Sequence, residues 1–356
     1  MASTLPLRAE LRGLTPYGAP MPDVPVRLNV NENPYPPSES LVAYAADAVA
    51  DVVRGLNRYP DRDALALRRD LAAYLGHGLD ETRVWAANGS NEVMLQLLQA
   101  FGGPGRMALS FAPTYSMYPE YARDTATSWV TGRRQEDFGV DRAHALDQVA
   151  RHRPSVVLLA SPNNPTGTAV PLELVVDLLD AVDGIVIVDE AYAEFRRVGT
   201  PSALTLLRDQ PRLVVVRTMS KAFAFAGARL GYLAASQEVV TAVQVVRLPY
   251  HLSAVTQAVA RVALAHAHEL LAKVAAIRMD RDLIAQWLRA QGLTVPDSDA
   301  NFVLVGRFPD RHAVWQGLLE RGVLVRETGP DGYLRVTVGT PEEMTAFRSA
   351  LVEVLR

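Results

Sequence analysis

The sequence predicts an α/β protein built on a mostly parallel sheet, with a second and smaller lobe towards its C-terminus. Three unbroken apolar runs, at 156–160, 185–188 and 213–216, alternate with longer stretches of helical periodicity. Runs of this kind are typical of strands that helices cover on both faces, and such strands are mostly parallel. With 356 residues, 49% of them hydrophobic, the chain is long enough to bury the cores of more than one lobe.

The N-terminal part is predicted to begin as an extended arm. The stretch 16–37 is rich in proline, which sustains neither a helix nor a central strand, so we expect it to wrap over a lobe or a partner subunit. A helix is predicted at 41–53. We assign residues 1–37 to the arm and residues 38–252 to a large domain.

Residues 253–356 are predicted to form the small domain. A helical apolar repeat begins at Val255, and short strands are predicted at 301–305 and 334–338. The last helix has clear start signals, because an N-cap, a first-turn proline and a capping-box glutamate follow in order at Thr340, Pro341 and Glu343.

Composition excludes several classes of function. The chain has no cysteine, so disulfides, thiolate catalysis and cysteine-based metal sites are ruled out. Its 7 histidines show no helix-spaced pair with an acidic residue, and we expect no metal site. A net charge of -3 with scattered lysine and arginine gives no sign of a nucleic-acid partner. No apolar segment approaches the roughly 20 residues that span a bilayer, and no signal-peptide pattern is found, so we expect a cytoplasmic protein without membrane contact.

The most informative stretch is 218–223, Thr-Met-Ser-Lys-Ala-Phe, which is followed by Arg229. It places Lys221 beside two hydroxyl groups with a guanidinium nearby. A lysine amine forms a Schiff base with the aldehyde of pyridoxal 5′-phosphate, and hydroxyl and guanidinium groups hold its phosphate. We therefore interpret Lys221 as the attachment point of this cofactor, with Ser220 and Arg229 at the phosphate. Two solvated surface charges would give the same pattern taken alone.

Two further polar motifs directly follow predicted strands. Asp189-Glu190-Ala191-Tyr192 follows the run 185–188, and Ser-Pro-Asn-Asn-Pro-Thr-Gly at 161–167 follows the run 156–160. Ligands of open α/β sheets bind at the carboxyl ends of the strands, so we expect both motifs to meet Lys221 at one site. Taken singly, Asp189 would be an ordinary loop acid and Asn164 a turn residue.

A turn of sequence Asn-Gly-Ser-Asn at 88–91 precedes a helical pattern that runs to residue 101. The amides at a helix N-terminus carry partial positive charge and bind phosphate without a lysine. We expect the amides near Ser90 and Asn91 to complete the phosphate site. A side-chain cap by Ser90 or Asn88 is a compatible alternative.

These motifs, in this order, resemble those of the class I and II aminotransferases of the aspartate aminotransferase fold, and more narrowly those of the histidinol-phosphate aminotransferase family. Five further segments match that family's pattern in sequence order: 14–18, 29–34, 57–61, 87–92 and 113–118. The similarity runs from about residue 10 to the C-terminus, with no catalytic position missing. It implies a fold type I transferase with a large, mostly parallel seven-stranded sheet and a smaller α/β domain.

The resemblance implies a role for each motif residue. Lys221 would carry the cofactor and afterwards move a proton between substrate and cofactor. Asp189 would face the pyridine nitrogen and favour its protonated form by charge attraction. Tyr192 and Asn164 would hydrogen-bond the phenolic oxygen of the cofactor. Tyr115 would stack on the ring face, with a core tyrosine as the alternative.

It also implies a substrate site and an assembly. Arg335 would bind the carboxylate of the amino acid and Arg326 a more distant anion, because a guanidinium engages carboxylate or phosphate bidentately. Tyr17 would add a hydroxyl donor. Tyr59 would reach the cofactor phosphate of the neighbouring subunit, which implies a homodimer. The implied reaction moves an amino group between L-histidinol phosphate and 2-oxoglutarate, giving imidazole acetol phosphate and L-glutamate, in histidine biosynthesis.

Alternatives stay open at this point. An aromatic amino-acid aminotransferase differs by few pocket contacts, and a phosphothreonine-type decarboxylase would also bind a phosphate through arginines. A non-catalytic regulator on this fold is disfavoured, because Lys221 is present. The group that contacts the imidazole ring is left open between Tyr17, Tyr250 and residues of a partner subunit. For His251 we favour a structural role over a contact with substrate.

Overall fold

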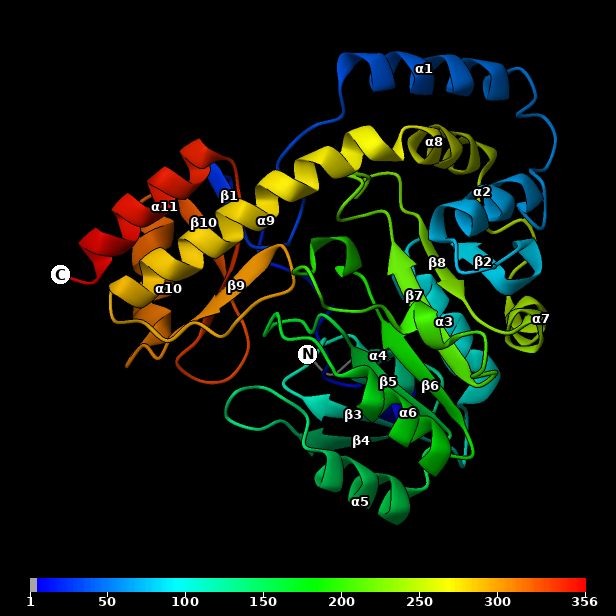
Figure 1. Cartoon of the computed structure of the whole chain (residues 1–356), viewed down its shortest axis with the longest axis horizontal. Coiled ribbons are helices and arrows are strands. Elements are labelled where there is room, and N and C mark those ends of the chain that lie inside the picture. Colours follow the sequence, from blue (N-terminus) through cyan, green and yellow to red (C-terminus); the bar gives the residue numbers. More distant parts are fainter. Residues whose placement is uncertain (1–4) are drawn as a thin grey trace.

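The computed structural model describes residues 5–356, in which two sheets are connected by a long helix (Figure 1). The large sheet has the strand order β2-β8-β7-β6-β5-β3-β4. β8 runs antiparallel to both of its neighbours, whereas the other pairings are parallel, so the prediction of a mostly parallel seven-stranded sheet is confirmed. Its strands are β2 (Val84–Ala87), β3 (Met107–Ala112), β4 (Ser128–Arg133), β5 (Val156–Ala160), β6 (Ile185–Asp189), β7 (Leu213–Thr218) and β8 (Gly231–Ala234).

Helices cover both faces of this sheet. They are α2 (Leu65–Leu75), α3 (Ser90–Phe101), α4 (Tyr118–Asp124), α5 (Arg142–His152), α6 (Leu172–Ala181) and α7 (Gln237–Val246). Val186 and Val188 of β6 pack in one core with α2, α5 and α6, while Ile185 and Ile187 pack in the other with α3 and α7. This double coverage is the physical reason why the central strands appear in the sequence as unbroken apolar runs.

The small sheet has the strand order β1-β10-β11-β9. Its strands are β1 (Val26–Leu28), β9 (Phe302–Val305), β10 (Val323–Glu327) and β11 (Leu334–Thr337). The helices α10 (Arg311–Glu320) and α11 (Pro341–Val354) pack beside it, and the capping box predicted at Thr340 and Glu343 is formed. β1 comes from the N-terminal arm and pairs in parallel with β10, so the arm contributes an edge strand that the sequence did not predict.

Two helices link the parts of the chain. α8 (Ala254–Ala265) packs against α1 (Glu39–Val53) and α2, and α9 (Ala267–Ala290) then crosses to the small sheet (Figure 1). The predicted domain boundaries stay predictions, since the arm joins the small sheet and α8 packs on helices that precede it. Within residues 5–356, none of the helices combines the length and the apolar character needed to cross a membrane.

Candidate active site

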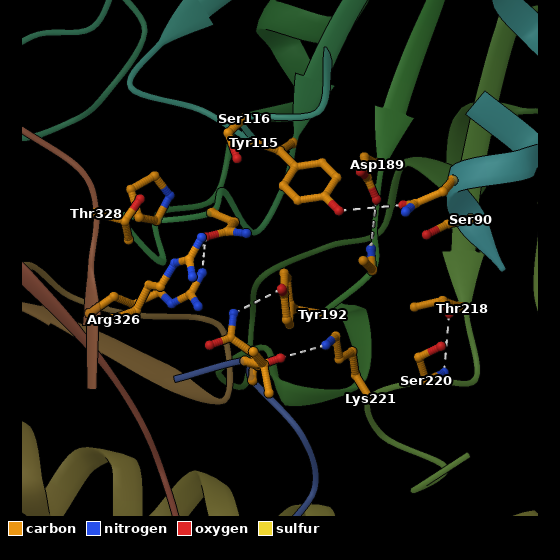
Figure 2. Close-up of a pocket in the computed structure, with 18 of the residues that line it drawn as sticks. Ser90, Tyr115, Ser116, Asp189, Tyr192, Thr218, Ser220, Lys221, Arg326 and Thr328 are labelled. Atoms are coloured by element: carbon orange, nitrogen blue, oxygen red, sulfur yellow. Dashed lines mark hydrogen bonds between the residues drawn. The ribbon is translucent and has the colours of Figure 1, made fainter. Parts of the chain in front are cut away.

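A cavity of about 270 Å³ lies at the carboxyl ends of β5, β6 and β7, between the two sheets (Figure 2). Its walls come from the N-terminal arm, the large sheet, the start of α3, and the strands β10 and β11. Of the residues that the sequence predicts for cofactor or substrate, all except Tyr59 line it: Tyr17, Ser90, Asn91, Tyr115, Asn164, Asp189, Tyr192, Ser220, Lys221, Arg229, Arg326 and Arg335. The expectation that the strand-end motifs meet at one site is therefore confirmed.

Lys221 lies in the turn after β7, and its amine points towards the arm. Its Nζ donates a hydrogen bond to the carbonyl oxygen of Val30 at 2.9 Å. Burial lowers the pKa of Lys221 to about 8, and the positive charges of Arg335 and Arg229 lower it as well, against the opposing charge of Glu32. A pKa this close to neutrality leaves part of the amine unprotonated, which attack on an aldehyde requires.

Asp189 ends β6 and is buried at the bottom of the cavity. Its Oδ2 accepts a hydrogen bond from the Tyr118 hydroxyl at 2.9 Å, and its Oδ1 accepts one from the amide of Ala191 at 3.1 Å. Burial raises the pKa of Asp189 to about 6, and these two hydrogen bonds oppose the rise. A cationic group facing this carboxylate would keep it ionised, which suits a protonated ring nitrogen.

On the other side of the cavity, the side-chain amides of two asparagines are hydrogen-bonded to Tyr192 and Arg335. The Tyr192 hydroxyl accepts a hydrogen bond from Nδ2 of Asn31 at 2.9 Å. Asn164 follows β5, and its Oδ1 accepts from Nη1 of Arg335 at 2.6 Å. Burial raises the pKa of the Tyr192 phenol, so this group is protonated and able to donate.

The start of α3, Ser220 and Arg229 converge on one end of the cavity. Nη1 of Arg229 donates to Oγ of Ser220 at 3.2 Å. Gly89 is the N-cap of α3, and a Cβ at this position would lie 2.5 Å from Nη2 of Arg229. The approach of this guanidinium to the helix therefore needs glycine, which also adopts the φ of +85° found here. Amides, a hydroxyl and a guanidinium together suit a phosphate group.

The alternative that a side chain caps α3 is wrong. Gly89 occupies the N-cap, and no side-chain cap bond is formed there. The Asn88 amide instead donates to Glu92 and to the carbonyl oxygen of His251. The first amides of α3 are consequently not used by a capping side chain.

Arg326 and Arg335 stand opposite each other on the paired strands β10 and β11. Arg335 is buried and donates from Nη2 to the carbonyl oxygen of Asn29 at 2.6 Å. Within the described chain, Nε of Arg335 and Nη1 of Arg326 are buried without a hydrogen-bond partner. Burial, and to a smaller extent the neighbouring charge of Arg326, lower the pKa of Arg335 to about 10. Two close guanidinium groups with unpaired N–H groups form a site for an anion.

Two tyrosines line the cavity on the side of the large domain. The Tyr115 hydroxyl lies 3.4 Å from Oδ1 of Asn91, and its ring meets that of Tyr118 edge-on at 5.6 Å. Tyr17 comes from the arm, and its hydroxyl is hydrogen-bonded to Oγ of Ser116 at 3.0 Å. The alternative of Tyr115 as a purely internal core residue is not favoured, because its side chain forms part of the cavity wall (Figure 2).

Tyr59 lies elsewhere on the surface. Its side chain is 80% exposed and stacks on the ring of Tyr250 at 4.4 Å. His251 is also outside the cavity wall: its Nε2 lies 2.9 Å from the carbonyl oxygen of Ala86, and its ring stacks on Trp85. These contacts agree with the structural role favoured for His251.

The sequence did not assign several residues that shape the cavity. Tyr118 lies within a matched segment, but its bond to Asp189 depends on how α4 folds back over β6. Asn31 likewise lies in a matched segment, and its contact with Tyr192 joins residues far apart in the chain. Ser116 lies in a matched segment as well, whereas Thr328 lies in none of them; both residues line the outer end of the cavity.

Comparison with known proteins identifies the class to which this fold and site belong. The sequence matches the family "Aminotransferase class I and II" over residues 23–351, and the chain belongs to this family. Among curated relatives, the histidinol-phosphate aminotransferase of Thermobifida fusca (strain YX) is 64% identical over 98% of this chain and 95% of its own length. That of Frankia casuarinae is 61% identical over 99% of this chain and 91% of its own length.

Solved structures agree with this assignment. The histidinol-phosphate aminotransferase from Sinorhizobium meliloti, in complex with pyridoxal-5'-phosphate, superimposes with a TM-score of 0.85 at 26% identity, covering 94% of this chain and 91% of that one. An aspartate aminotransferase from Thermus thermophilus gives a TM-score of 0.79 at 27% identity, with coverage of 94% and 91%. The predicted aspartate aminotransferase fold is therefore confirmed.

Proposed function

We propose that this chain is a pyridoxal 5′-phosphate-dependent aminotransferase that moves an amino group between L-histidinol phosphate and 2-oxoglutarate in histidine biosynthesis. The observation that carries the proposal is the single cavity in which a lysine of lowered pKa, a buried carboxylate and two partly unpaired arginines meet. The full-length relatives named as histidinol-phosphate aminotransferases support the choice of substrate.

The residues present fit the cofactor. Lys221 supplies the amine, Asp189 supplies a carboxylate for the ring nitrogen, and the start of α3 with Ser220 and Arg229 supplies the phosphate site. When bound, the cofactor supplies an electron-withdrawing ring that makes the neighbouring carbon of the substrate more acidic. Asp189 strengthens that effect by favouring a protonated ring nitrogen, and Tyr115 covers the ring face.

Lys221 also serves as the proton carrier. Its amine lies in the wall of the cavity and has a pKa of about 8, so it both takes up and returns a proton near neutral pH. Tyr192 and Asn164 would hydrogen-bond the phenolic oxygen of the cofactor. Arg335 and Arg326 hold the anionic groups of the substrates, which are two carboxylates in glutamate and a phosphate in histidinol phosphate. Tyr17 adds a hydroxyl donor at the outer end.

Single-turnover measurements test the proposed substrate. The purified protein, loaded with pyridoxal phosphate, is mixed separately with L-histidinol phosphate, L-glutamate, L-phenylalanine or phosphothreonine, and the formation of pyridoxamine phosphate is followed. We expect fast conversion by histidinol phosphate and glutamate and much slower conversion by phenylalanine. A preference for phenylalanine would make the protein an aromatic aminotransferase, and release of carbon dioxide from phosphothreonine would make it a decarboxylase. Lys221→Ala is the matched inactive control.

The proposal includes a homodimer in which Tyr59 reaches the cofactor phosphate of the partner subunit. Tyr59 is 80% exposed and stacks on Tyr250, which is also exposed. Other apolar side chains close to one of these tyrosines in the sequence are exposed as well: Leu56, Val245 and Leu248. Exposed aromatic and apolar groups of this kind favour an interface. The cytoplasmic location expected from the sequence is part of the same proposal.

Subunit complementation tests the shared site. If Tyr59 reaches across the interface, each site of the dimer takes Lys221 from one subunit and Tyr59 from the other. A dimer of one Lys221→Ala subunit and one Tyr59→Ala subunit then carries both changes in the same site. Mixed dimers of the two variants would therefore contain one doubly damaged site and one intact site, and we expect them to recover about half of the wild-type activity. A mixture no more active than the two variants measured separately would refute the contribution of Tyr59 across the interface.

A further inference from the structure

Asn31 lies in the N-terminal arm and is hydrogen-bonded to Tyr192. Its side chain is 1% exposed, and its backbone φ of +56° is in the left-handed region, which asparagine adopts more readily than most residues. Nδ2 of Asn31 is 2.9 Å from the Tyr192 hydroxyl, an interaction drawn as a dashed line at Tyr192 in Figure 2. Asn31 and Tyr192 both line the cavity, and the Asn31 amide thus contacts the predicted catalytic phenol within the cavity wall.

The orientation of the Asn31 amide follows from the hydrogen bonds of Thr337. The backbone N–H of Asn31 donates to Oγ1 of Thr337 at 3.1 Å, so this oxygen already accepts one proton. The Thr337 hydroxyl proton is then free to donate to Oδ1 of Asn31, which lies 3.0 Å away. Because Oδ1 faces Thr337, the NH2 group is the end that faces Tyr192.

The reversed amide is disfavoured on the same grounds. If the NH2 group faced Thr337, the threonine oxygen would be approached by two donors, and its own proton would have no acceptor. Thr337 is 3% exposed, and a buried hydroxyl proton without an acceptor costs about 1–3 kcal/mol. The network of Asn31 and Thr337 is therefore fully satisfied in only one orientation.

We infer that Asn31 is a positioning residue that directs the hydroxyl proton of Tyr192 into the cavity. The Tyr192 oxygen accepts from the Asn31 amide, and within residues 5–356 its hydroxyl has no other hydrogen-bond partner. Its proton is consequently available to an acceptor in the cavity, which makes Tyr192 a fixed donor. This inference rests on the proposed function, because the acceptor it supplies is the phenolic oxygen of the cofactor.

The consequence is a measurable change in the bound cofactor. A hydroxyl that donates to the phenolic oxygen stabilises negative charge there, so the cofactor loses its titrating proton at a lower pH. Without Asn31, the Tyr192 hydroxyl rotates and donates less often. Loss of Asn31 is therefore expected to raise the pKa of the bound cofactor in the same direction as loss of the Tyr192 hydroxyl, but by less.

The test is a double-mutant cycle read from the visible absorbance of the cofactor-loaded protein as a function of pH. Asn31→Gly removes the amide while keeping a backbone that tolerates the positive φ. We expect Tyr192→Phe to raise the cofactor pKa by about one unit and Asn31→Gly by about half a unit. In the Tyr192→Phe background, Asn31→Gly should add less than about 0.2 units, because its effect passes through the missing hydroxyl.

A second pair of variants tests the network if Asn31→Gly folds poorly. Thr337→Val removes the hydroxyl that orients the amide and should raise the cofactor pKa, whereas Thr337→Ser keeps that hydroxyl and should leave the pKa at its wild-type value. Asn301→Ala is the control for a loosened arm, because Nδ2 of Asn301 donates only to the carbonyl oxygens of Asn31 and Glu32. We expect Asn301→Ala to lower thermal stability without moving the cofactor pKa.

The outcomes separate this inference from the proposed function. If Tyr192→Phe leaves the cofactor pKa unchanged, the role of Tyr192 in the proposed function is wrong, and the role of Asn31 falls with it. If Tyr192→Phe moves the pKa but Asn31→Gly and Thr337→Val do not, only the positioning role of Asn31 is overturned. An Asn31→Gly shift that persists in full in the Tyr192→Phe background would overturn it as well.

Discussion

The hydroxyl of Tyr118 donates to Oδ2 of Asp189 across 2.9 Å, with both side chains buried beneath the cavity. Tyr118 is the first residue of α4, and Asp189 is the last residue of β6. The phenol of Tyr118 in α4 therefore holds the carboxylate of Asp189 in place at the end of β6. It also opposes the effect of burial, which raises the pKa of Asp189 to about 6.

Removing this hydroxyl should weaken cofactor binding. In Tyr118→Phe the carboxylate loses a hydrogen bond that favours its charged form, so the pKa of Asp189 rises further above its ordinary value. We expect the Kd for pyridoxal phosphate to rise about tenfold, which corresponds to the ~1.5 kcal/mol of a hydrogen bond to a charged group. The loss of affinity should be larger at pH 6 than at pH 8, because Asp189 is more often protonated at pH 6.

Titration of cofactor binding to the cofactor-free protein measures this effect. Tyr121→Phe is the control, since it removes another buried hydroxyl from the same helix and leaves the bond to Asp189 intact. Equal losses in both variants would contradict a specific role for Tyr118.

The capture of pyridoxal phosphate by Lys221 should depend on pH with a midpoint near the lysine pKa of about 8. Only the unprotonated amine attacks the aldehyde, so the rate should rise as the pH rises through this value. Arg335 contributes to the low pKa by charge repulsion. Arg335→Met should therefore move the midpoint to higher pH, as measured by stopped-flow absorbance, and an unchanged midpoint would show that Arg335 does not help to set the lysine pKa.

The contact between Gly89 and Arg229 should be sensitive to a single methyl group. In Gly89→Ala the new Cβ would meet Nη2 of Arg229 at 2.5 Å, so the guanidinium must shift away from the start of α3. Gly103→Ala is the matched control, because Gly103 also has a positive φ but has no neighbour within 4 Å of a Cβ. Both variants should lose about 1 kcal/mol of stability from backbone strain. Only Gly89→Ala should weaken cofactor binding, and equal affinity of the two variants would refute the steric explanation.

The two arginines should differ in their effects on the substrates. Arg335→Lys keeps the charge but loses the planar fork, and we expect kcat/KM to fall about 100-fold for both histidinol phosphate and glutamate. Arg326→Gln should reduce kcat/KM for glutamate more than for alanine, which lacks a distal anion. An effect of Arg335→Lys on glutamate alone would contradict a site shared by both substrates.

Features that depend on a local pattern could be predicted from the sequence. The apolar runs located β5, β6 and β7, and the polar residues after them located Asn164, Asp189 and Lys221 at the cavity. Parallel strands carry this information because their carboxyl ends meet at one sheet edge. The capping box at Thr340 is equally local and was also predicted.

Features that depend on distant pairing could not be predicted in the same way. The strand β1 lies in a proline-rich stretch, and its partner β10 is near the other end of the chain. The hydrogen bonds from Tyr118 to Asp189 and from Asn31 to Tyr192 each join separate elements, so no spacing in the sequence reveals them. Tyr59 was predicted to reach the cofactor phosphate of the neighbouring subunit. It lies on the surface of the single subunit, so this contact stays a prediction about the dimer.

The pairing of β1 with β10 also dictates the order in which the molecule is completed during its synthesis. The arm is among the first segments to leave the ribosome, but Val26–Leu28 has no strand to pair with until residues 323–327 have been translated. Until Thr337 has been translated as well, Asn31 also lacks the two hydrogen bonds that it shares with this residue. A nascent chain that has already folded its large sheet therefore still lacks Arg326, Arg335 and the strand that holds the arm, so its cavity is incomplete.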